Sequence, residues 1–401
     1  MNTECSIVGV VSDDPFAIDV AHHAGQAADI DDIIAMKRFA NTEFCPRFIS
    51  DERDFDHIGK SLRKKTVIIV STCCGNHTRN ALAMRSFLVA RAAKDNGAER
   101  VVLIQPDLFY SAQDRGARPE QGDVDFKRST ADYKKFDGQP FSAQLYAQLL
   151  QTSGVDAVVT VHNHSVSVQR LFAQQFHGKF YNLSPATLFA DYLISHDPAG
   201  QESDASNLII CAPDDGAQEF VGEMGEAIGK AVSKRLLGTA PQLLFMTKKR
   251  SAERQVSIAV SPDSPLGLPE ITGKTVVVFD DMVRTGSTVM ECCRLLKQAG
   301  AERVLFVVTH FYSSDEVKEN LNDRAIDEIV TTNTLPTILN RDMQGRLRKK
   351  MMVLKIEKWL ATVIHNEFNC GGHNRRDSLY SIDISSKNPR WQPPHGMQPG
   401  P

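Results

Sequence analysis

The sequence has no hydrophobic run that approaches the length of a membrane span. Residues 1–14 also lack the basic flank, apolar block and small-residue cleavage site of a secretory signal. We therefore expect a cytoplasmic protein with no membrane partner. Excess basic charge is absent too, because the formal net charge is −3 over 401 residues, so we expect no nucleic-acid partner.

Cysteines with the spacing of a zinc site are also missing. The eight cysteines include two adjacent pairs, Cys73-Cys74 and Cys292-Cys293, but no Cys-x-x-Cys motif and no plausible disulfide framework. This pattern argues against zinc and favours reduced thiols that pack as small apolar groups. With 42% hydrophobic and 24% charged residues, the chain is a globular protein long enough for two domains with separate cores.

What the chain does contain is an internal repeat. Residues 94–101 read Lys-Asp-Asn-Gly-Ala-Glu-Arg-Val and residues 297–304 read Lys-Gln-Ala-Gly-Ala-Glu-Arg-Val, and each copy leads into an apolar strand that ends in Phe-Tyr-Ser. The echo extends backwards, since residues 65–70 and 274–279 both read Lys-Thr followed by four apolar residues. Both copies therefore predict strand, loop, helix, glycine turn and strand in that order.

Short apolar runs alternate with helical patterns along the rest of the chain, which is typical of parallel α/β sheets. We predict two tandem, doubly wound parallel-sheet domains related by internal duplication, at residues 1–179 and 180–339. Residues 340–370 are expected to form a C-terminal helix that packs back on the first domain. Two segments rich in glycine and in charged residues or proline, an insertion at 116–140 and a tail at 371–401, are expected to be mobile surface.

The most specific pattern is a strand, two acids, a small hydroxyl-rich turn and a helix. Residues 276–279 predict a buried strand, so Asp280 and Asp281 would emerge at the carboxyl edge of the sheet, where open α/β sheets bind ligands. There the two carboxylates can accept hydrogen bonds from ribose hydroxyls. The turn opens a helix at 289–299, so backbone N–H groups, hydroxyls and the helix dipole converge on one anion such as a 5′-phosphate. The turn residues are Thr285, Gly286, Ser287 and Thr288.

This pattern resembles the phosphoribosyl-diphosphate loop shared by type I phosphoribosyltransferases and ribose-phosphate diphosphokinases. Ser287 stands where glycine is usual, and Arg284, which is expected beside the phosphate, stands where the diphosphokinases commonly carry an acid. The transferases have one domain of this kind, whereas the repeat predicts two. The chain is therefore similar to the ribose-phosphate diphosphokinase family along roughly its first 370 residues, which implies two domains of the type I phosphoribosyltransferase kind.

The resemblance extends to motifs on the nucleotide side. In the family's adenine-side loop, an aromatic ring stacks on the base while an amide and a carboxylate bond its edge. A later strand-end reads Tyr-Ala-Arg-Gln-Asp-Arg, and a histidine further on helps to hold Mg²⁺–ATP. Two residues depart from this pattern, since Ala112 replaces arginine and His162 replaces an acid. The matching residues, which the resemblance implies bind ATP, are Phe39, Asn41, Glu43, Gln113, Asp114 and His164.

Two further motifs concern the metal and the phosphoryl transfer. A Pro-Asp-Asp-Gly turn looks like the family's Pro-Asp-x-Gly turn, so Asp214, together with His164, is implied to contact Mg²⁺. Residues 247–250 follow an apolar strand and resemble the start of the family's flexible catalytic loop, in which Lys248 and Arg250 match the essential lysine and arginine. A basic loop of this kind positions the transferring phosphate and neutralises its oxygens.

The resemblance implies an enzyme that uses Mg²⁺ to transfer the diphosphoryl group of ATP to the 1-hydroxyl of ribose 5-phosphate, giving phosphoribosyl diphosphate and AMP. It also implies a homo-oligomer, since the family forms hexamers whose sites borrow residues across subunits. Because Ala112, His162 and Arg284 depart from the family at ligand-facing positions, two alternatives stay open. One is a catalytically weak regulatory paralogue, and the other is a diphosphokinase for a different sugar phosphate.

Overall fold

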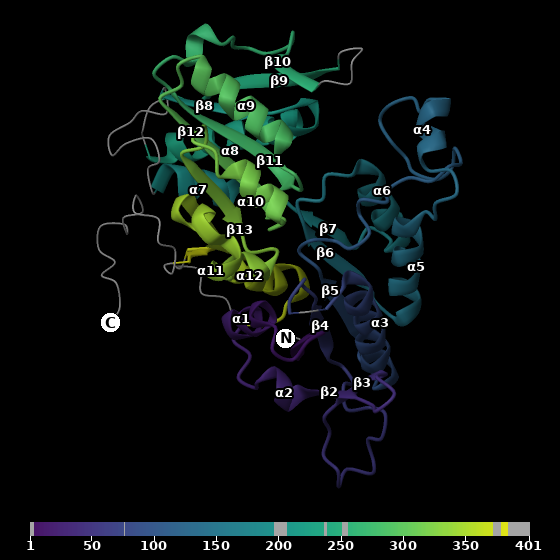
Figure 1. Cartoon of the computed structure of the whole chain (residues 1–401). Helices are drawn as coiled ribbons and strands as arrows, with labels where there is room; N and C mark the ends of the chain where they lie inside the picture. Colours follow the sequence, from purple (N-terminus) through teal and green to yellow (C-terminus); the bar gives the residue numbers. More distant parts are fainter. Residues whose placement is uncertain are drawn as a thin grey trace. The chain divides into compact units, whose positions relative to one another are not determined.

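The chain folds into two compact units in a computed structural model that describes residues 4–75, 77–195, 207–235, 239–250, 256–371 and 378–383 (Figure 1). Unit 1 comprises Met1–Leu183, Thr334–Pro336 and Ile356–Tyr380. Unit 2 comprises Ser184–Asn333, Thr337–Lys355 and Ser381–Pro401. Among the described residues, no helix has both the length and the apolar character that crossing a membrane requires.

Unit 1 is built on a five-stranded parallel sheet in the order β1-β4-β5-β6-β7. Its inner strands are rich in valine and isoleucine and buried on both faces, as parallel sheets require. A separate antiparallel hairpin joins β2 and β3. The strands are β1 Cys5–Gly9, β2 Ile34–Arg38, β3 Phe44–Phe48, β4 Thr66–Val70, β5 Arg100–Ile104, β6 Ala157–Val161 and β7 Phe180–Leu183.

The helices of unit 1 come from both ends of the chain. Helix α1 packs against α12, which follows unit 2 in sequence, and α3 packs against α5. The helices are α1 Pro15–His23, α2 Ile30–Ile33, α3 Arg79–Asp95, α4 Thr130–Lys135, α5 Ser142–Ser153, α6 Val166–Gln175 and α12 Glu357–Phe368.

Unit 2 is built on an eight-stranded sheet in the order β10-β9-β8-β11-β12-β13-β14-β15. Its central strands run parallel, and the edge strands β10 and β15 pair antiparallel. The strands are β8 Leu208–Ala212, β9 Gln242–Arg250, β10 Val256–Val260, β11 Thr275–Val283, β12 Arg303–Phe311, β13 Glu328–Thr332, β14 Met351–Lys355 and β15 Ser381–Ile382.

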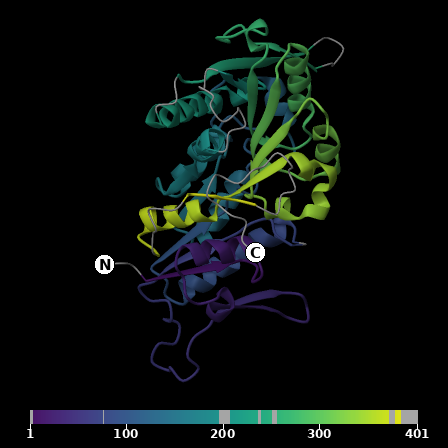
Figure 2. The ribbon, with the colours of Figure 1, turned by 90° about the vertical axis from the view of Figure 1, so that its left-hand side faces the viewer.

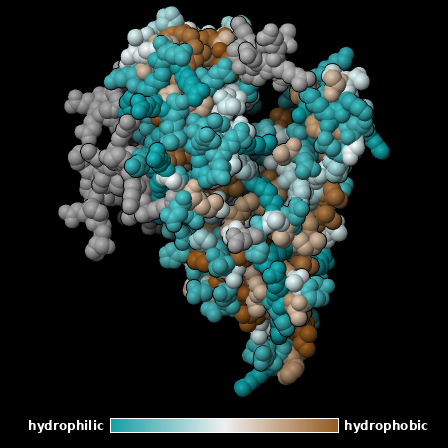
Figure 3. Space-filling view, viewed as in Figure 1, coloured by the Kyte–Doolittle hydropathy of each residue, from teal (hydrophilic) through white to brown (hydrophobic). Residues whose placement is uncertain are grey.

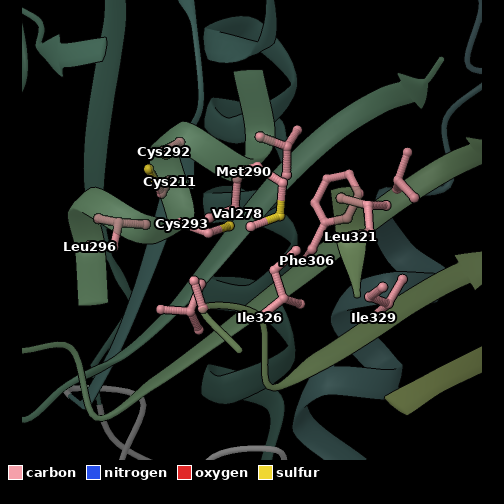
Figure 4. Packing of buried hydrophobic residues seen from close by; sticks show 14 of the residues in the cluster. Cys211, Val278, Met290, Cys292, Cys293, Leu296, Phe306, Leu321, Ile326 and Ile329 are labelled. Carbon is pink, nitrogen blue, oxygen red and sulfur yellow. The ribbon is translucent and has the colours of Figure 1, made fainter. Parts of the chain in front are cut away.

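Helices lie on both faces of this sheet, with the teal α8 on one side and the green α9 on the other (Figure 2). Met290, Cys293 and Leu296 of α9 are at most 3% exposed and pack over Val278 and Phe306 of the sheet (Figure 4). The helices are α7 Ala186–Ser195, α8 Gln218–Arg235, α9 Ser287–Gln298, α10 Asp315–Leu321 and α11 Arg341–Gln344, and the 3₁₀ turns are η2 Asp215–Ala217, η3 Pro269–Ile271, η4 Pro336–Leu339 and η5 Gly345–Lys350.

The internal repeat predicted from the sequence is also present in the structure, where both units make equivalent contacts. The Lys94 ammonium pairs with Asp156 at 2.7 Å in unit 1, and Lys297 pairs with Asp327 at 2.7 Å in unit 2. Each of these carboxylates also accepts a hydrogen bond from the N–H of the second residue of the strand that follows the repeated helix. The glycine that ends each of these helices has a positive φ. The predicted fold class, two duplicated parallel α/β domains, is confirmed.

One local prediction is wrong. The sequence predicts a loop at residues 247–250, but β9 continues through Arg250 and pairs with β10, placing Lys248 opposite Ile258. The antiparallel partner supplies hydrogen bonds for the backbone of a segment whose side chains are polar, and this partner is not visible in the local pattern. Residues 251–255, which follow this segment, lie outside the described residues.

The segment 116–140, which was predicted to be mobile surface, has structure of its own. It contains α4 and a buried ion pair in which Arg128 Nε donates to Asp132 Oδ2 at 2.6 Å. The same guanidinium donates to the carbonyls of Gly116 and Gln121 and lies 4.2 Å from the Tyr133 ring centroid. The buried guanidinium thus satisfies backbone carbonyls of the segment and stabilises its folded conformation. In the predicted tail, β15 pairs with β14, and residues 384–401 lie outside the described part.

Exposed apolar side chains gather on the outer face of α3 and α5 in unit 1 (Figure 3). Met84 of α3 and Leu145 of α5 are 56% and 52% exposed, and Leu149, one helical turn beyond Leu145, is 42% exposed.

Candidate functional site

Acidic residues meet a lysine at the carboxyl ends of β8 and β9 in unit 2. The chain leaves β8 at Ala212 and turns, and the Asp214 carboxylate caps this turn by accepting from Gly216 N–H at 3.1 Å. The Lys248 ammonium lies 2.5 Å from Asp214 Oδ2, and the Thr247 hydroxyl donates to Asp215 at 2.9 Å. The structure thus brings the predicted metal-side acid and the predicted catalytic lysine into contact.

Asp280 and Asp281 lie within β11 rather than just after it. Pairing with β12 continues to Val283, whereas pairing with β8 ends at Val278, so the acids lie beyond the end of β8 on that side. The sequence therefore placed the acids at the right edge of the sheet but ended the strand too early. β11 continues past the acids because β12, which is equally long, provides pairing partners on one side of it.

The carboxylates at this edge interact with one another. Burial, the neighbouring Asp281 carboxylate and the Asp214 carboxylate together raise the pKa of Asp280 well above its ordinary value. The N–H of Asp281 donates to Asp280 Oδ1 at 2.9 Å. Without a cation or a donor from a ligand, the cluster therefore retains a proton on Asp280 to a higher pH than a free aspartate does. A cation or a hydroxyl donor that binds to these carboxylates would offset their mutual repulsion.

The turn before α9 leaves the start of that helix open. Gly286 is the N-cap residue, with φ +80°, and it supplies no side-chain cap for the N–H groups of the first turn. A Cβ at Gly286 would lie 3.1 Å from a methyl carbon of Leu321, so both the backbone angle and the space favour glycine. The Asn320 amide fixes the turn by donating to the Thr285 carbonyl at 2.7 Å, and the Thr285 hydroxyl lies 3.3 Å from that of Ser287.

This geometry suits an anion. Backbone N–H groups and small hydroxyls converge at the N-terminus of α9, where the helix dipole is positive. The side chains of Arg284, Thr285 and Ser287 are exposed beside it, and Thr288 is half-buried. The predicted sugar-phosphate residues therefore lie together at one edge of the sheet of unit 2.

On the nucleotide side, Asp114 lies beside the strand-end that carries His164. The Ser165 hydroxyl donates to Asp114 Oδ2 at 2.8 Å, and the Ser167 hydroxyl donates to the Asp114 carbonyl at 2.7 Å. Gln113 is exposed next to Asp114. Three of the predicted ATP-binding residues, which come from two separate loops, are thus held close together by serines of α6 and its cap.

A network of amides fixes the turn that contains His162 and His164. Asn163 N–H donates to Asn182 Oδ1 at 2.8 Å, and Asn182 returns a hydrogen bond to the Asn163 carbonyl at 3.0 Å. His162 has a φ of +47°, a left-handed conformation that costs energy for a residue with a Cβ. His164 is exposed. The rigid turn therefore presents His164 at the surface, while the strain falls on His162, the residue that departs from the family pattern.

The predicted adenine-side loop forms the tip of the β2–β3 hairpin. Phe39 is 42% exposed, with the Lys37 ammonium 4.8 Å from its ring centroid. Asn41 Oδ1 accepts from Glu43 N–H at 3.2 Å, and both residues are exposed. Figure 1 shows the β2–β3 hairpin and α6 at opposite ends of unit 1.

Some predicted contributions lie beyond the described residues. Arg250 belongs to β9, but its side chain is outside the described part. Among the described residues, no group of three or more His, Cys, Asp or Glu side chains forms a preformed metal centre. His164 and Asp214 lie in different units, so a shared role in metal binding stays a prediction.

The sequence did not indicate the residues that hold the predicted site residues in position. Ser165 and Asn182 hold Asp114 and the His164 turn, and Asp215 holds the residue before Lys248. Only Ser165 had a local signal, because a serine directly before a helix is a favoured N-cap. The others act through contacts between residues far apart in sequence.

A duplicated α/β fold with an acid pair and an uncapped phosphate-type turn defines a phosphoribosyltransferase-like protein. Residues 142–338 match the phosphoribosyl transferase domain, and residues 7–154 match the N-terminal domain of ribose phosphate pyrophosphokinase, another name for the diphosphokinase. The chain belongs to the ribose-phosphate pyrophosphokinase family, as a divergent member. The resemblance predicted from the sequence is confirmed.

Known proteins match most of the chain. The ribose-phosphate pyrophosphokinase of Corynebacterium efficiens is 28% identical over 335 residues, covering 83% of this chain and 84% of that protein. Ribose-phosphate pyrophosphokinase 2 of Saccharomyces cerevisiae is 28% identical over 286 residues, covering 71% of this chain and 76% of that protein. The crystal structure of phosphoribosylpyrophosphate synthetase from Mycobacterium smegmatis has a TM-score of 0.66 and 25% identity, covering 91% of this chain and 99% of that one.

Proposed function

We propose that this protein transfers the diphosphoryl group of ATP to the 1-hydroxyl of ribose 5-phosphate, giving phosphoribosyl diphosphate and AMP. The observation that carries the proposal is the two-part match, because residues 7–154 match a domain named for ribose phosphate pyrophosphokinase and residues 142–338 match the phosphoribosyl transferase domain. Relatives that bear the enzyme's name cover most of the chain, so the assignment does not rest on one motif.

Unit 2 would hold the sugar phosphate. The N-terminus of α9, with Thr285, Gly286, Ser287 and Thr288, would bind the 5′-phosphate, as its uncapped N–H groups support. Asp280 and Asp281 would accept from the ribose hydroxyls, and Arg284 would add a donor for anionic oxygen.

Unit 1 would hold the nucleotide. Gln113, Asp114 and His164 would contribute to one surface for ATP, and the serine contacts to Asp114 support this assignment. Phe39, Asn41 and Glu43 would contact the adenine. Because their hairpin tip lies away from that surface, the adenine contacts would come from a second copy of the chain, and we propose a homo-oligomer, a hexamer by family resemblance.

Magnesium fits the residues present. The carboxylates at this edge, where burial and the neighbouring acids raise the pKa of Asp280, would supply the hard oxygen ligands that Mg²⁺ prefers. His164 would help to hold the Mg²⁺ that binds with ATP, and Asp214 would lie near a further Mg²⁺. When bound, the ion would neutralise charge on the phosphate oxygens of ATP.

The chain's own basic residues would act on the transferring group. The oxygen of the 1-hydroxyl would attack the β-phosphorus and release its proton to water, while the bond from that phosphorus to the oxygen shared with the α-phosphorus would break, releasing AMP. Lys248 and Arg250 would neutralise the oxygens of the β-phosphate as this happens. Lys248 pairs with Asp214 in the structure, so it would exchange this partner for the phosphate.

We further propose a cytoplasmic location.

The proposal is tested with purified protein, ATP, Mg²⁺ and ribose 5-phosphate, by separating the nucleotide products. We expect AMP and phosphoribosyl diphosphate in equal amounts, and only when the sugar phosphate is present. ADP as the product would contradict diphosphoryl transfer. Absence of turnover would favour the regulatory paralogue, and AMP formed only with another sugar phosphate would favour the diphosphokinase of different specificity.

A further inference from the structure

Arg115 joins the segment 116–140 to the proposed ATP surface of unit 1. Its Nε donates to Asp114 Oδ1 at 3.2 Å, and its Nη1 donates to Asp132 Oδ1 of α4 at 3.2 Å. The Arg115 side chain is 23% exposed, and the side chains of the two acids are 19% and 11% exposed. One half-buried guanidinium thus bridges an acid of the nucleotide side and an acid of the segment.

The segment holds this guanidinium from its own side. The ring centroids of Phe126 and Phe136 lie 5.6 Å and 5.0 Å from Arg115 Cζ. Asp132 is fixed in turn, because its Oδ2 accepts from the buried Arg128 at 2.6 Å. The position of the Arg115 guanidinium therefore depends on the fold of the segment.

Asp114 receives one side-chain donor on each carboxylate oxygen. Arg115 donates to Oδ1, and the Ser165 hydroxyl donates to Oδ2 at 2.8 Å. Ser165 follows His164 directly in the chain. The segment also packs against the backbone of this acid, because a Cβ at Gly122 would lie 3.0 Å from the Asp114 carbonyl oxygen. Asp114 is thus held between the segment on one side and the His164 turn on the other.

The charges of this network balance, with two carboxylates and two guanidiniums. Without Arg115, Asp132 would keep Arg128 as its cation. Within the described part of unit 1, the side-chain donor left on the Asp114 carboxylate would be the uncharged Ser165 hydroxyl. A less firmly held carboxylate with no cation beside it would then repel the phosphates of an approaching ATP.

We propose that Arg115 is a positioning residue for ATP, which orients the Asp114 carboxylate and neutralises its charge where the nucleotide binds. The inference rests on the proposed function, because it requires Asp114 to lie at the ATP surface. The role of the segment 116–140 is then to hold the Arg115 guanidinium in place.

The test measures the dissociation constant of ATP with Mg²⁺ by calorimetric titration without sugar phosphate. The Michaelis constant for ATP and kcat are then measured with ribose 5-phosphate. Arg115→Gln should raise both ATP constants roughly tenfold and leave kcat within about twofold, because Asp114 loses its charged donor in the ground state and the transition state alike. Arg115→Lys keeps the charge but lacks the planar fork that spans both acids, so it should raise the two constants only about threefold.

Arg170→Gln is the matched control. Arg170 of α6 also ties the segment to the rest of unit 1, through Asp123 at 3.0 Å and Asp125 at 2.5 Å, but its ion pairs within the described residues do not include Asp114. This control should keep wild-type ATP affinity. A double-mutant cycle adds Arg115→Gln to Asp114→Asn, where the added loss of affinity should stay below about threefold because no carboxylate remains to be neutralised.

Unchanged ATP affinity in Arg115→Gln would overturn the inference, and so would an equal loss in Arg170→Gln, because the segment would then only have loosened. A full loss that persists with Asp114→Asn would show that Arg115 does not act through Asp114, and would overturn it as well. The titration needs no turnover, so a wild type that binds ATP but forms no AMP contradicts the proposed function and leaves the comparison of affinities decisive. Circular dichroism checks that each variant is folded. If Arg115→Gln is not, wild-type affinity in Arg115→Lys overturns the inference.

Discussion

Replacing Lys248 with alanine should abolish most of the turnover while leaving the fold and ATP binding nearly intact. The ammonium pairs with Asp214, and the two side chains are 36% and 23% exposed. An ion pair in such a solvated position contributes about 0–1 kcal/mol, so its loss should shift the thermal midpoint by no more than about 2 °C. Removing a donor that meets charge developing in the transition state instead costs about 3–4 kcal/mol, or a factor of roughly 10²–10³ in kcat.

The assay is steady-state production of AMP at saturating ATP and ribose 5-phosphate, together with calorimetric titration of ATP. Lys230→Ala is the matched control, because Lys230 also pairs with an acid, Glu226 at 3.3 Å, but lies exposed on α8. This control should keep wild-type turnover. If Lys248→Ala raised the Michaelis constant for ATP while kcat at saturation stayed unchanged, the lysine would bind the ground state, and the reasoning about the transition state would be refuted.

Three further perturbations address the ligand sides separately. Asp280→Asn with Asp281→Asn should weaken ribose 5-phosphate at least tenfold in calorimetric titration and leave ATP affinity within about twofold, because the acids face sugar hydroxyls. The pKa of Asp280 is raised above the ordinary aspartate value of 3.8, so the folded protein loses stability as the pH rises above 3.8 and through the raised pKa. The same double variant should therefore melt at a higher temperature than the wild type at neutral pH without ligands. Arg284→Asp should raise the Michaelis constant for ribose 5-phosphate while diphosphoryl transfer persists. Ser165→Ala should raise the Michaelis constant for ATP roughly tenfold with little change in kcat, because Asp114 loses its 2.8 Å donor.

Each of these expectations has an outcome that contradicts it. Unchanged sugar-phosphate affinity in the double asparagine variant would remove the loop assignment. Better use of ribose 5-phosphate by Arg284→Asp would mean that the arginine selects another substrate, and no change in either constant would mean that it faces solvent. Ser314→Ala, which removes a comparable N-cap from α10, controls for simple helix destabilisation in Ser165→Ala.

The sequence alone was sufficient to predict those parts of the site whose residues follow one another in the chain. Four apolar residues, then Asp280 and Asp281, then a glycine turn and a helix place the acids and the anion site at one sheet edge, because a parallel strand must end where its helix begins. The repeat was equally visible in the sequence, from residues 94–101 and 297–304, and its Lys-to-Asp contacts recur in both units of the structure.

Contacts made by the tertiary fold were not accessible from local patterns. Lys248 meets Asp214 across 34 positions, and Ser165 meets Asp114 across 51. The hairpin that turns residues 247–250 into strand depends on β10, whose pairing no local pattern indicated. Propensity describes neighbours in sequence, whereas these contacts depend on which strands become neighbours in the sheet.

The duplication also explains why the sugar phosphate is proposed for unit 2. Because Val70 ends β4 where Phe279 stands in β11, Ser71 and Thr72 occupy the positions of Asp280 and Asp281 in the repeat. In unit 1 the Thr72 hydroxyl donates to Asp14 at 2.7 Å, and that fully buried acid caps α1. The equivalent strand end in unit 1 thus uses its polar groups internally, whereas unit 2 places two acids at the edge, close enough to Asp214 to raise the pKa of Asp280. The same frame therefore carries neutral hydroxyls in one copy and a charge cluster that demands cations or hydroxyl donors in the other, and only the second matches the chemistry of a ribose phosphate.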